Sequence, residues 1–256
     1  MLTVANLSTG YTKGKETVLV SADLSFDLPS VIILGIVGRN GSGKSTLLKT
    51  LAGTLAPLSG TIHLESRNLQ QIKHHDKALL LGIVTTERNF SGLLTGWNIL
   101  SMGRYPHNGW LGSLRTEDKH VLHEVVQRIQ MEEKIFHPIA TYSDGQLQRL
   151  LIGRALVQQT PYLLLDEPTV HLDLHHKAQV FGLIKQAVQD AKKTVVFSTH
   201  EVNHALQLCT HILLLHKEEG YFGSPQELIA QGAFGKLFPN TLVAFDPKTQ
   251  QFKLCY

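Results

Sequence analysis

The stretch VGRNGSGKST, residues 37–46, constrains the fold of this chain more than any other part of the sequence. A strand-like apolar run precedes it, and a helical pattern follows it. It fits the pattern G-x-x-x-x-G-K-[ST] at Gly38, Gly43, Lys44 and Ser45. Glycines let the backbone curl so that several N–H groups converge on phosphate oxygens, and the following helix adds its positive end. The pattern predicts a phosphate-binding loop, with Lys44 on the terminal phosphates and the Ser45 hydroxyl on Mg²⁺; a plain glycine-rich turn is the alternative.

The composition is that of a soluble globular protein, with 43% hydrophobic and 18% charged residues. The 24 basic and 21 acidic side chains give a net charge of +3 without a basic cluster, so we expect no nucleic-acid partner. Two cysteines make no disulfide framework, and the first residues lack the apolar core of a signal peptide, which favours a reducing cytoplasm. No apolar stretch approaches the roughly 18 residues that span a bilayer, so a role at a membrane needs a spanning partner.

Short apolar runs alternate with helical patterns along the chain. The runs VIILGIV, LLLGIV, YLLLD, TVVFS and HILLL are bounded by Gly, Thr, Asp or Pro and predict buried strands. Helical patterns cover residues 44–55, 172–189 and 201–208. Strands that alternate with helices indicate an α/β fold with a mainly parallel sheet that is covered on both faces.

The sequence also predicts how one domain over residues 1–256 is divided. From about residue 89 to residue 160 strand-like runs are missing, and TEDKHVLHEVVQRIQMEEKI carries apolar residues at helical spacing. We expect a helical subdomain there, inserted between residues 1–88 and 161–230 of a nucleotide-binding core. Residues 231–256 form a C-terminal extension, with two short strands expected around LVAF and QFKLC.

Two further strand ends carry polar side chains that suit phosphate chemistry. YLLLDEPT places Asp166 and Glu167 at the end of an apolar strand, where carboxylates are costly unless a metal or hydrogen bonds receive them. In a parallel sheet this end faces the ligand crevice. We predict that Asp166 holds Mg²⁺ through a water and that Glu167 is the general base for the attacking water; a plain acidic turn is the alternative. TVVFSTH places His200 at the same edge, where it could contact the γ-phosphate.

Together these residues resemble the ATP-binding subunit of ABC transporters. GRNGSGKST, TYSDGQLQRLLIGRAL, LLLDEPT, VHLD and STHE stand in that family's order, and the resemblance covers about residues 1–230. It implies a P-loop NTPase fold of ABC type, with a mainly parallel core sheet, an N-terminal antiparallel β part and an inserted helical subdomain that carries the signature loop. It implies ATP and Mg²⁺ as ligands and Glu167 and His200 as catalytic residues. The residues then expected at the nucleotide are Tyr11, Gly38, Asn40, Gly41, Ser42, Gly43, Lys44, Ser45, Thr46, Ser143, Gly145, Gln146, Asp166 and Asp173.

The resemblance also assigns individual roles. Tyr11 is expected to stack on adenine, Ser143 and Gly145 to belong to the signature loop, Asp173 to lie in the D-loop, and His200 to be the switch histidine. Ser45 and Asp166 are the expected metal contacts.

The sequence departs from the family pattern at two places. The signature reads YSDGQ where the family has LSGGQ, which puts the Asp144 carboxylate near the opposing subunit's γ-phosphate; like charges repel there unless Asp144 points away. After the strand in LGIVTTERNF the family has a glutamine, and this chain offers Thr86, which is too short, or its neighbour Glu87 as the metal contact. Both departures bear on the coupling of hydrolysis to a membrane partner.

The segment GRYPH, residues 103–107, is similar to one in ATPases that serve importers of iron-siderophores, haem and cobalamin. It falls in the helical insertion, which in that family contacts the transmembrane subunits. A helix ended by proline and followed by a polar loop is the alternative. The 14 histidines include His171 and His175, four residues apart, but a metal site needs a third convergent ligand, so we expect surface histidines and no dedicated metal site.

We therefore expect an ATP-hydrolysing subunit that energises a membrane importer for an iron-siderophore, haem or cobalamin. The resemblance implies a homodimer in which the Ser143 loop of one copy closes over ATP on the Lys44 loop of the other. It also implies transmembrane permease subunits as partners and a cytoplasmic location, peripheral on the inner face of the cell membrane. One alternative is a soluble ABC-type ATPase that acts on nucleic acid or a protein assembly. A second is a module that binds ATP with little turnover, which Asp144 and Thr86 suggest.

Overall fold

The computed structural model describes residues 1–14, 16–87, 90–108, 112–237 and 242–255. The chain forms two compact units, one made of Met1–Ile72 and Thr194–Tyr256 and the other of Lys73–Lys193. Residue 89, where the helical insertion is expected to begin, lies outside the described residues. No helix in the described part of the chain is long and apolar enough to cross a membrane.

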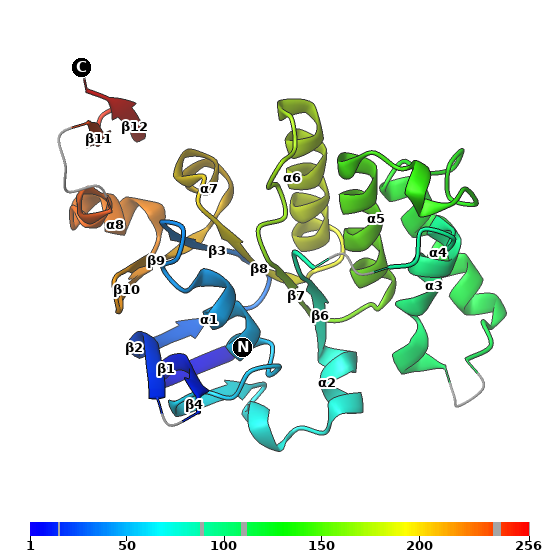
Figure 1. The fold of residues 1–256 in the computed structure, drawn as a ribbon, viewed down its shortest axis with the longest axis horizontal. Coiled ribbons are helices and arrows are strands. Elements are labelled where there is room, and N and C mark those ends of the chain that lie inside the picture. The colour runs from blue at the N-terminus through cyan, green and yellow to red at the C-terminus, as the bar shows by residue number, and fades with distance from the viewer. Residues whose placement is uncertain (15, 88–89, 109–111, 238–241, 256) are drawn as a thin grey trace. The chain divides into compact units, whose positions relative to one another are not determined.

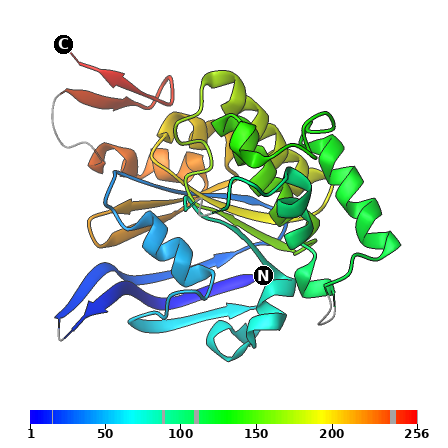
Figure 2. The same cartoon turned by 45° about the vertical axis from the view of Figure 1, so that its right-hand side comes forward.

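The first unit contains two sheets with a helix between them (Figures 1 and 2). An antiparallel sheet has the order β2-β1-β4-β5, and a second sheet has the order β10-β9-β3-β8 within this unit. Strand β3 pairs in parallel with both β8 and β9, while β10 pairs antiparallel with β9. Helix α1 contacts β1 on one side and β3 and β8 on the other. The bounds are β1 Leu2–Lys13, β2 Glu16–Leu28, β3 Ile33–Gly38, α1 Lys44–Leu51, β4 Ser59–Leu64, β5 Arg67–Asn68, η1 Leu69–Gln71, β8 Thr194–Thr199, α7 Val202–Leu208, β9 His211–His216, β10 Glu219–Gly223, α8 Pro225–Ala230, η4 Ala233–Lys236, β11 Val243–Asp246 and β12 Gln251–Leu254.

The second unit is mostly helical around one pair of parallel strands, β6 and β7. Helix α2 lies beside β6, and α5 contacts α3, α4 and α6, so α5 is the central helix of this unit (Figure 1). Its apolar side chains are almost all buried, which is why its sequence shows little helical amphipathicity. The bounds are α2 His74–Leu80, β6 Leu81–Val84, α3 Gly96–Met102, η2 Tyr105–His107, α4 Thr116–Arg128, η3 Ile139–Thr141, α5 Asp144–Val157, β7 Tyr162–Leu165 and α6 Leu174–Gln189.

These elements confirm the predicted α/β class, with parallel core strands, an N-terminal antiparallel part and helices. Two predicted boundaries are wrong. In LLLGIV the first two leucines end α2, and the strand begins only at Leu81. Helix α1 ends at Leu51 rather than at residue 55, because Gly53 adopts a left-handed φ of +67° that a helix does not continue through.

The C-terminal residues form the expected hairpin from β11 and β12. Its aromatic side chains pack with η4, since the Phe234 and Phe245 rings stack with centroids 5.0 Å apart and those of Phe245 and Phe252 lie 5.1 Å apart. The Phe252 backbone N–H donates to Asn203 Oδ1 of α7 at 3.1 Å. The hairpin is thus attached to the first unit by apolar packing and by a hydrogen bond to α7.

A buried ion pair joins three helical segments of the second unit. Arg104 Nε donates to Asp118 Oδ1 at 2.8 Å, and Arg104 Nη1 donates to the Val157 carbonyl at 2.7 Å. Both charged side chains are more than nine-tenths buried. Burial alone raises the pKa of Asp118, but hydrogen bonds from the Arg115 N–H and from Arg104 outweigh it and hold this pKa below its usual value.

Replacing Asp118 by Asn should lower the free energy of unfolding by about 3 kcal/mol, because a buried guanidinium then loses its counter-charge. Urea unfolding followed by circular dichroism measures the loss. The matched control is Glu124→Gln on the same helix, which removes an exposed contact with His120 and should cost less than about 0.5 kcal/mol. Equal losses in both variants would contradict a special role for the buried pair.

Lys193 is a second buried cation of this unit. Its Nζ donates to the Thr160 carbonyl, and it has no counter-ion among the described residues. Burial, with a smaller effect of Arg128, lowers its pKa from 10.5 to about 8. The unfolded chain therefore binds the proton more tightly than the folded chain, so folding becomes more favourable as the pH rises from about 8 to 10.5.

Lys193→Met should remove this pH dependence. The wild type should gain about 2 kcal/mol of unfolding free energy relative to Lys193→Met between pH 7.5 and pH 9.5. Denaturant unfolding of both proteins at the two pH values measures the gain. Parallel pH profiles for the two proteins would show that the Lys193 pKa is not lowered.

Candidate functional site

The predicted phosphate loop connects β3 to α1 and is curled around the Lys44 side chain. Lys44 is 5% exposed, and its Nζ donates to the carbonyls of Gly38 and Arg39, each at 3.1 Å. Gly41 and Gly43 have φ values of +80° and +90°. A Cβ at Gly43 would also lie 2.0 Å from Val20 Cγ1, so only glycine fits at this position.

The local chemistry of the loop fits a phosphate group. Helix α1 begins at Lys44, and its N-cap residue Gly43 has no side chain to cap it, so the positive end of the helix is suited to an anion. Ser42 Oγ is buried and has no hydrogen-bond partner among the described residues. A loop with an uncapped helix start and an unsatisfied hydroxyl is suited to receive phosphate oxygens.

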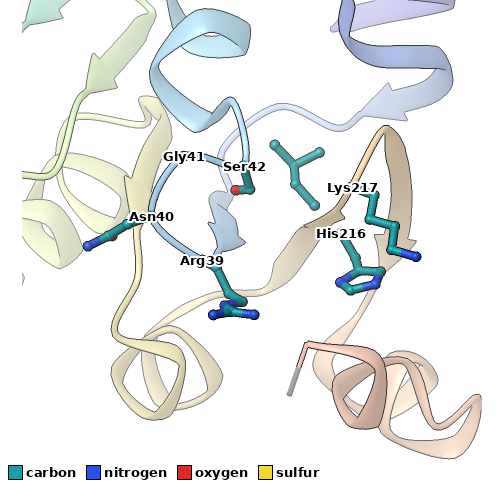
Figure 3. A pocket seen from close by; sticks show the side chains of 7 residues that line it. Arg39, Asn40, Gly41, Ser42, His216 and Lys217 are labelled. Carbon is teal, nitrogen blue, oxygen red and sulfur yellow. The ribbon is translucent and has the colours of Figure 1, made fainter. Parts of the chain in front are cut away.

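Two pockets of the first unit border the loop. One, of about 410 Å³, is lined by loop residues and by the end of β9 with its turn, as Figure 3 shows for Arg39, Ser42, His216 and Lys217. The other, of about 300 Å³, is lined by Gly38, Arg39, Asn40, His200, Val202 and Leu237. The structure thus brings His200, which follows β8 and is exposed, to the same pocket as the phosphate loop.

The remaining predicted residues of the first unit lie in β1 and α1. Tyr11 is in β1 opposite Val18, and its side chain is 49% exposed. Thr46 and Ser45 stand in the first turn of α1 and are half-buried. An exposed ring on β1 can receive a planar ligand from solvent, which is compatible with the role expected for Tyr11.

The predicted acidic pair lies in the second unit, directly after β7. Asp166 is 3% exposed, and its backbone N–H donates to the Val84 carbonyl at 2.8 Å. Glu167 is half-buried and has a left-handed φ of +45°, a conformation that is rare outside glycine and that bends the chain at this residue. The residues Thr86 and Glu87 follow β6 and are both exposed.

The predicted signature residues start helix α5. Ser143 is the N-cap: its Oγ accepts from the Gln146 N–H at 3.3 Å, and Gln146 Oε1 accepts from the Ser143 N–H at 3.0 Å. This reciprocal capping box fixes the entry of the helix. Asp144 is exposed in the first turn, where a carboxylate interacts favourably with the helix dipole.

His176 connects the starts of α5 and α6, and the sequence analysis did not predict it. Asp173 caps α6 by accepting from the His176 N–H at 2.8 Å, and the ring Nδ1–H of His176 donates to the same carboxylate at 2.9 Å. These bonds lower the pKa of Asp173. The ring packs on Gly145, where a Cβ would lie 2.0 Å from His176 Cδ2. Only the three-residue spacing from an N-cap aspartate could have indicated His176 in the sequence.

The predicted site residues therefore fall into two groups, each assembled within one unit. The first unit holds Tyr11, His200 and the phosphate loop up to Thr46. The second holds the acidic pair, the signature residues and Asp173. Each group carries a distinct capability: the first suits phosphate binding, and the second carries carboxylates suited to a metal and a proton.

The comparisons with known proteins agree with this chemistry. The model of the family described as ABC transporter matches residues 21–170, more than half of the chain. An ABC transporter ATP-binding protein of Methanocaldococcus jannaschii is 33% identical and covers 93% of this chain, which spans 81% of that protein. The iron(3+)-hydroxamate import ATP-binding protein FhuC of Bacillus subtilis is 32% identical, with 84% of this chain and 79% of that protein covered.

Solved structures agree as well. A metal-chelate type ABC transporter in an inward-facing conformation has a chain that is 29% identical, with a TM-score of 0.80 over 98% of this chain and 94% of that one. A dimeric ATP-binding cassette bound to ADP and Pi in a post-hydrolysis state is 25% identical, with a TM-score of 0.76 over 88% of this chain and 98% of that one. The predicted family and activity are confirmed: the chain belongs to the ABC transporter family, as an ATP-binding subunit that hydrolyses ATP to power transport.

Proposed function

We propose that this subunit drives the import of an iron chelate across the cell membrane. Its relatives include the import ATP-binding protein FhuC of Bacillus subtilis and the ferric enterobactin transport ATP-binding protein FepC of Escherichia coli, of which it spans 79% and 84%. The observation that carries the proposal is the phosphate loop with its buried Lys44 and uncapped α1 in a chain of this family. A soluble ABC-type ATPase acting on nucleic acid is not favoured, because these relatives serve transport.

We propose a part in nucleotide binding or hydrolysis for each of the two groups, as membership of the family implies. The phosphate loop, residues 38–46, holds the triphosphate, and Tyr11 stacks on the adenine ring. Ser45 and Asp166, with Thr86 or Glu87, would hold Mg²⁺, which would supply positive charge to the triphosphate. Hydroxyl and carboxylate oxygens are the donors that this hard cation prefers.

Hydrolysis then depends on a positioned base and on a group at the γ-phosphate. Glu167 is held in a strained backbone conformation directly after β7, which directs its carboxylate independently of the strand. It accepts a proton from the attacking water. His200, which lines a pocket with the phosphate loop, contacts the γ-phosphate.

We propose that the working unit is a homodimer. Ser143, Gly145 and Gln146 of one copy, supported by Asp173, close over the ATP that lies on the phosphate loop of the other. The dimeric cassette of 25% identity supports this arrangement. ATP binding closes the dimer and product release opens it, which is the kind of ligand-driven switch that can move a membrane partner.

The contact with transmembrane permease subunits is proposed at the GRYPH segment. Arg104 is buried in its ion pair, and His107 Nε2 lies 2.8 Å from the Gln158 carbonyl, so both are turned into the helical unit. Tyr105 between them is 60% exposed. Exposed tyrosines held by a rigid base are suited to protein contacts. The proposed place of action is the inner face of the cell membrane.

Glu167→Gln should bind ATP with unchanged affinity and lose about 100-fold or more of its hydrolysis rate, because the amide cannot accept the proton of water. Phosphate release and size-exclusion chromatography with ATP measure turnover and the ATP-stabilised dimer. Glu132→Gln, an exposed carboxylate of the same unit, is the matched control and should hydrolyse ATP normally. Wild-type turnover in Glu167→Gln would remove Glu167 from the base role.

Tyr105→Ala should leave the ATPase rate of the isolated subunit unchanged and weaken its association with the membrane partner about tenfold or more. Co-purification of the tagged subunit from gently solubilised native membranes, with mass spectrometry of the bound polytopic protein, measures this. Leu254→Ala removes a similarly exposed apolar side chain, 64% exposed, from the C-terminal strand and should not weaken the association. Recovery of soluble proteins alone with the unaltered subunit would argue against the importer role.

A further inference from the structure

The helical unit contains a buried guanidinium, at Arg149 of α5, that has no counter-ion among the described residues. Arg149 is 7% exposed. Its Nη1 donates to the Ile129 carbonyl at 3.0 Å and reaches Gln130 Oε1 only at 3.5 Å. Its Nε is buried and has no hydrogen-bond partner among the described residues. Burial lowers the pKa of Arg149, and no carboxylate acts against this effect.

Arg104, which is also buried in this unit, is compensated by its ion pair with Asp118. The half-buried Arg154 lies over the Phe90 ring with its Cζ 5.4 Å from the centroid. A buried charge without a partner is unfavourable, so such a group commonly marks a place for a ligand or an ion. Arg149 is therefore the exception that requires an explanation.

A cavity of about 150 Å³ lies beside Arg149, between the end of α4, α5 and α6. No carboxylate lines it in the described chain; its lining is Arg128, Ile129, Gln130, Arg149, Gln179, Gly182, Leu183 and Gln186. No described atom outside the nearby chain of α6 lies within 4 Å of the place that a Cβ of Gly182 would take, so there is open space beside Gly182. Its size admits a tetrahedral oxyanion with water.

The surrounding charge favours an anion as the ligand. Arg128, an exposed residue that also lines the cavity, adds a second positively charged side chain near it, and its charge contributes, after burial, to the lowered pKa of Lys193. The Gln179 Oε1 atom has no partner among the described residues, while its Nε2 donates to Gln130 Oε1 at 3.3 Å. A water bound beside the anion would donate to this acceptor. Guanidinium groups bind oxyanions well through charge-assisted hydrogen bonds.

We propose that this cavity is a binding site for a small inorganic oxyanion, phosphate or sulfate, held by Arg149 and Arg128. Binding would supply the missing counter-charge of Arg149 and join α5 to α6. The proposal does not rest on the ATPase activity, since it follows from the cavity and its charges. Because Ser143 caps α5 and Asp173 caps α6, the bound ion would stabilise the two helices that these residues precede.

The test uses the full-length chain labelled with ¹⁵Nε-arginine, in a Lys44→Ala background that weakens phosphate binding at the phosphate loop. Inorganic phosphate is titrated while the Nε–H resonance of Arg149, identified by its loss in Arg149→Lys, is followed by NMR. We expect a saturable shift with phosphate and with sulfate, and none with chloride at equal ionic strength. A resonance that stays in place throughout the phosphate titration would overturn the proposal.

Two variants test the site without removing Arg149. Gln179→Glu places a carboxylate beside the guanidinium and should weaken phosphate binding more than tenfold, and Gly182→Leu should do the same by filling the open space beside Gly182. Arg128→Gln should weaken binding about tenfold, while Lys119→Gln, an exposed cation on the same helix outside the lining, should not change it. Equal weakening by Arg128→Gln and Lys119→Gln, or unchanged affinity in folded Gln179→Glu and Gly182→Leu, would show that no built site exists.

Discussion

The turn between β3 and α1, where the chain curls around Lys44, is the constraint on which the proposed nucleotide site depends. A turn whose backbone N–H groups can meet phosphate oxygens needs left-handed φ values and a helix whose first turn no side chain caps. Gly43 meets both needs, since it has a φ of +90° and, as the N-cap residue of α1, has no side chain that could cap the helix. Two sets of contacts hold this junction in place. Strand β3 pairs with β8 on one side and β9 on the other, and α1 packs against β1 of the antiparallel sheet.

The parallel strands and the main motifs could be predicted from the sequence because burial on both faces makes such strands continuous apolar runs. For the same reason the polar residues that follow them, such as Asp166 and His200, stand out at the strand ends. The antiparallel strands are harder to predict from the sequence. In β2 the first four residues are exposed, and buried and exposed residues alternate only in the later part of the strand. In the candidate site His176 was missed because its contact with Gly145 joins residues far apart in the chain.

The GRYPH segment shows why a motif cannot assign a role to each of its residues. Arg104 makes buried hydrogen bonds to α4 and to the end of α5, and His107 lies against the Gln158 carbonyl. These side chains fix the segment, whereas Tyr105 extends from it. The sequence shows the five residues as one motif. Only the packing shows that Arg104 and His107 anchor the segment in the helical unit, whereas Tyr105 is exposed for a contact.

The capping box at α5 is compatible with the role in nucleotide binding that we propose for Ser143. A serine hydroxyl has one donor and two acceptor positions. The capping bond from the Gln146 N–H uses an acceptor, which leaves the O–H for the kind of bond that a phosphate oxygen requires. Asp144 stands one residue later, where the helix dipole favours its charge. Aspartate in place of the family's glycine therefore stabilises the start of the helix. It also adds negative charge beside the Ser143 hydroxyl, which would weaken the binding of a phosphate there. The effect on helix stability and the effect on phosphate binding thus oppose each other.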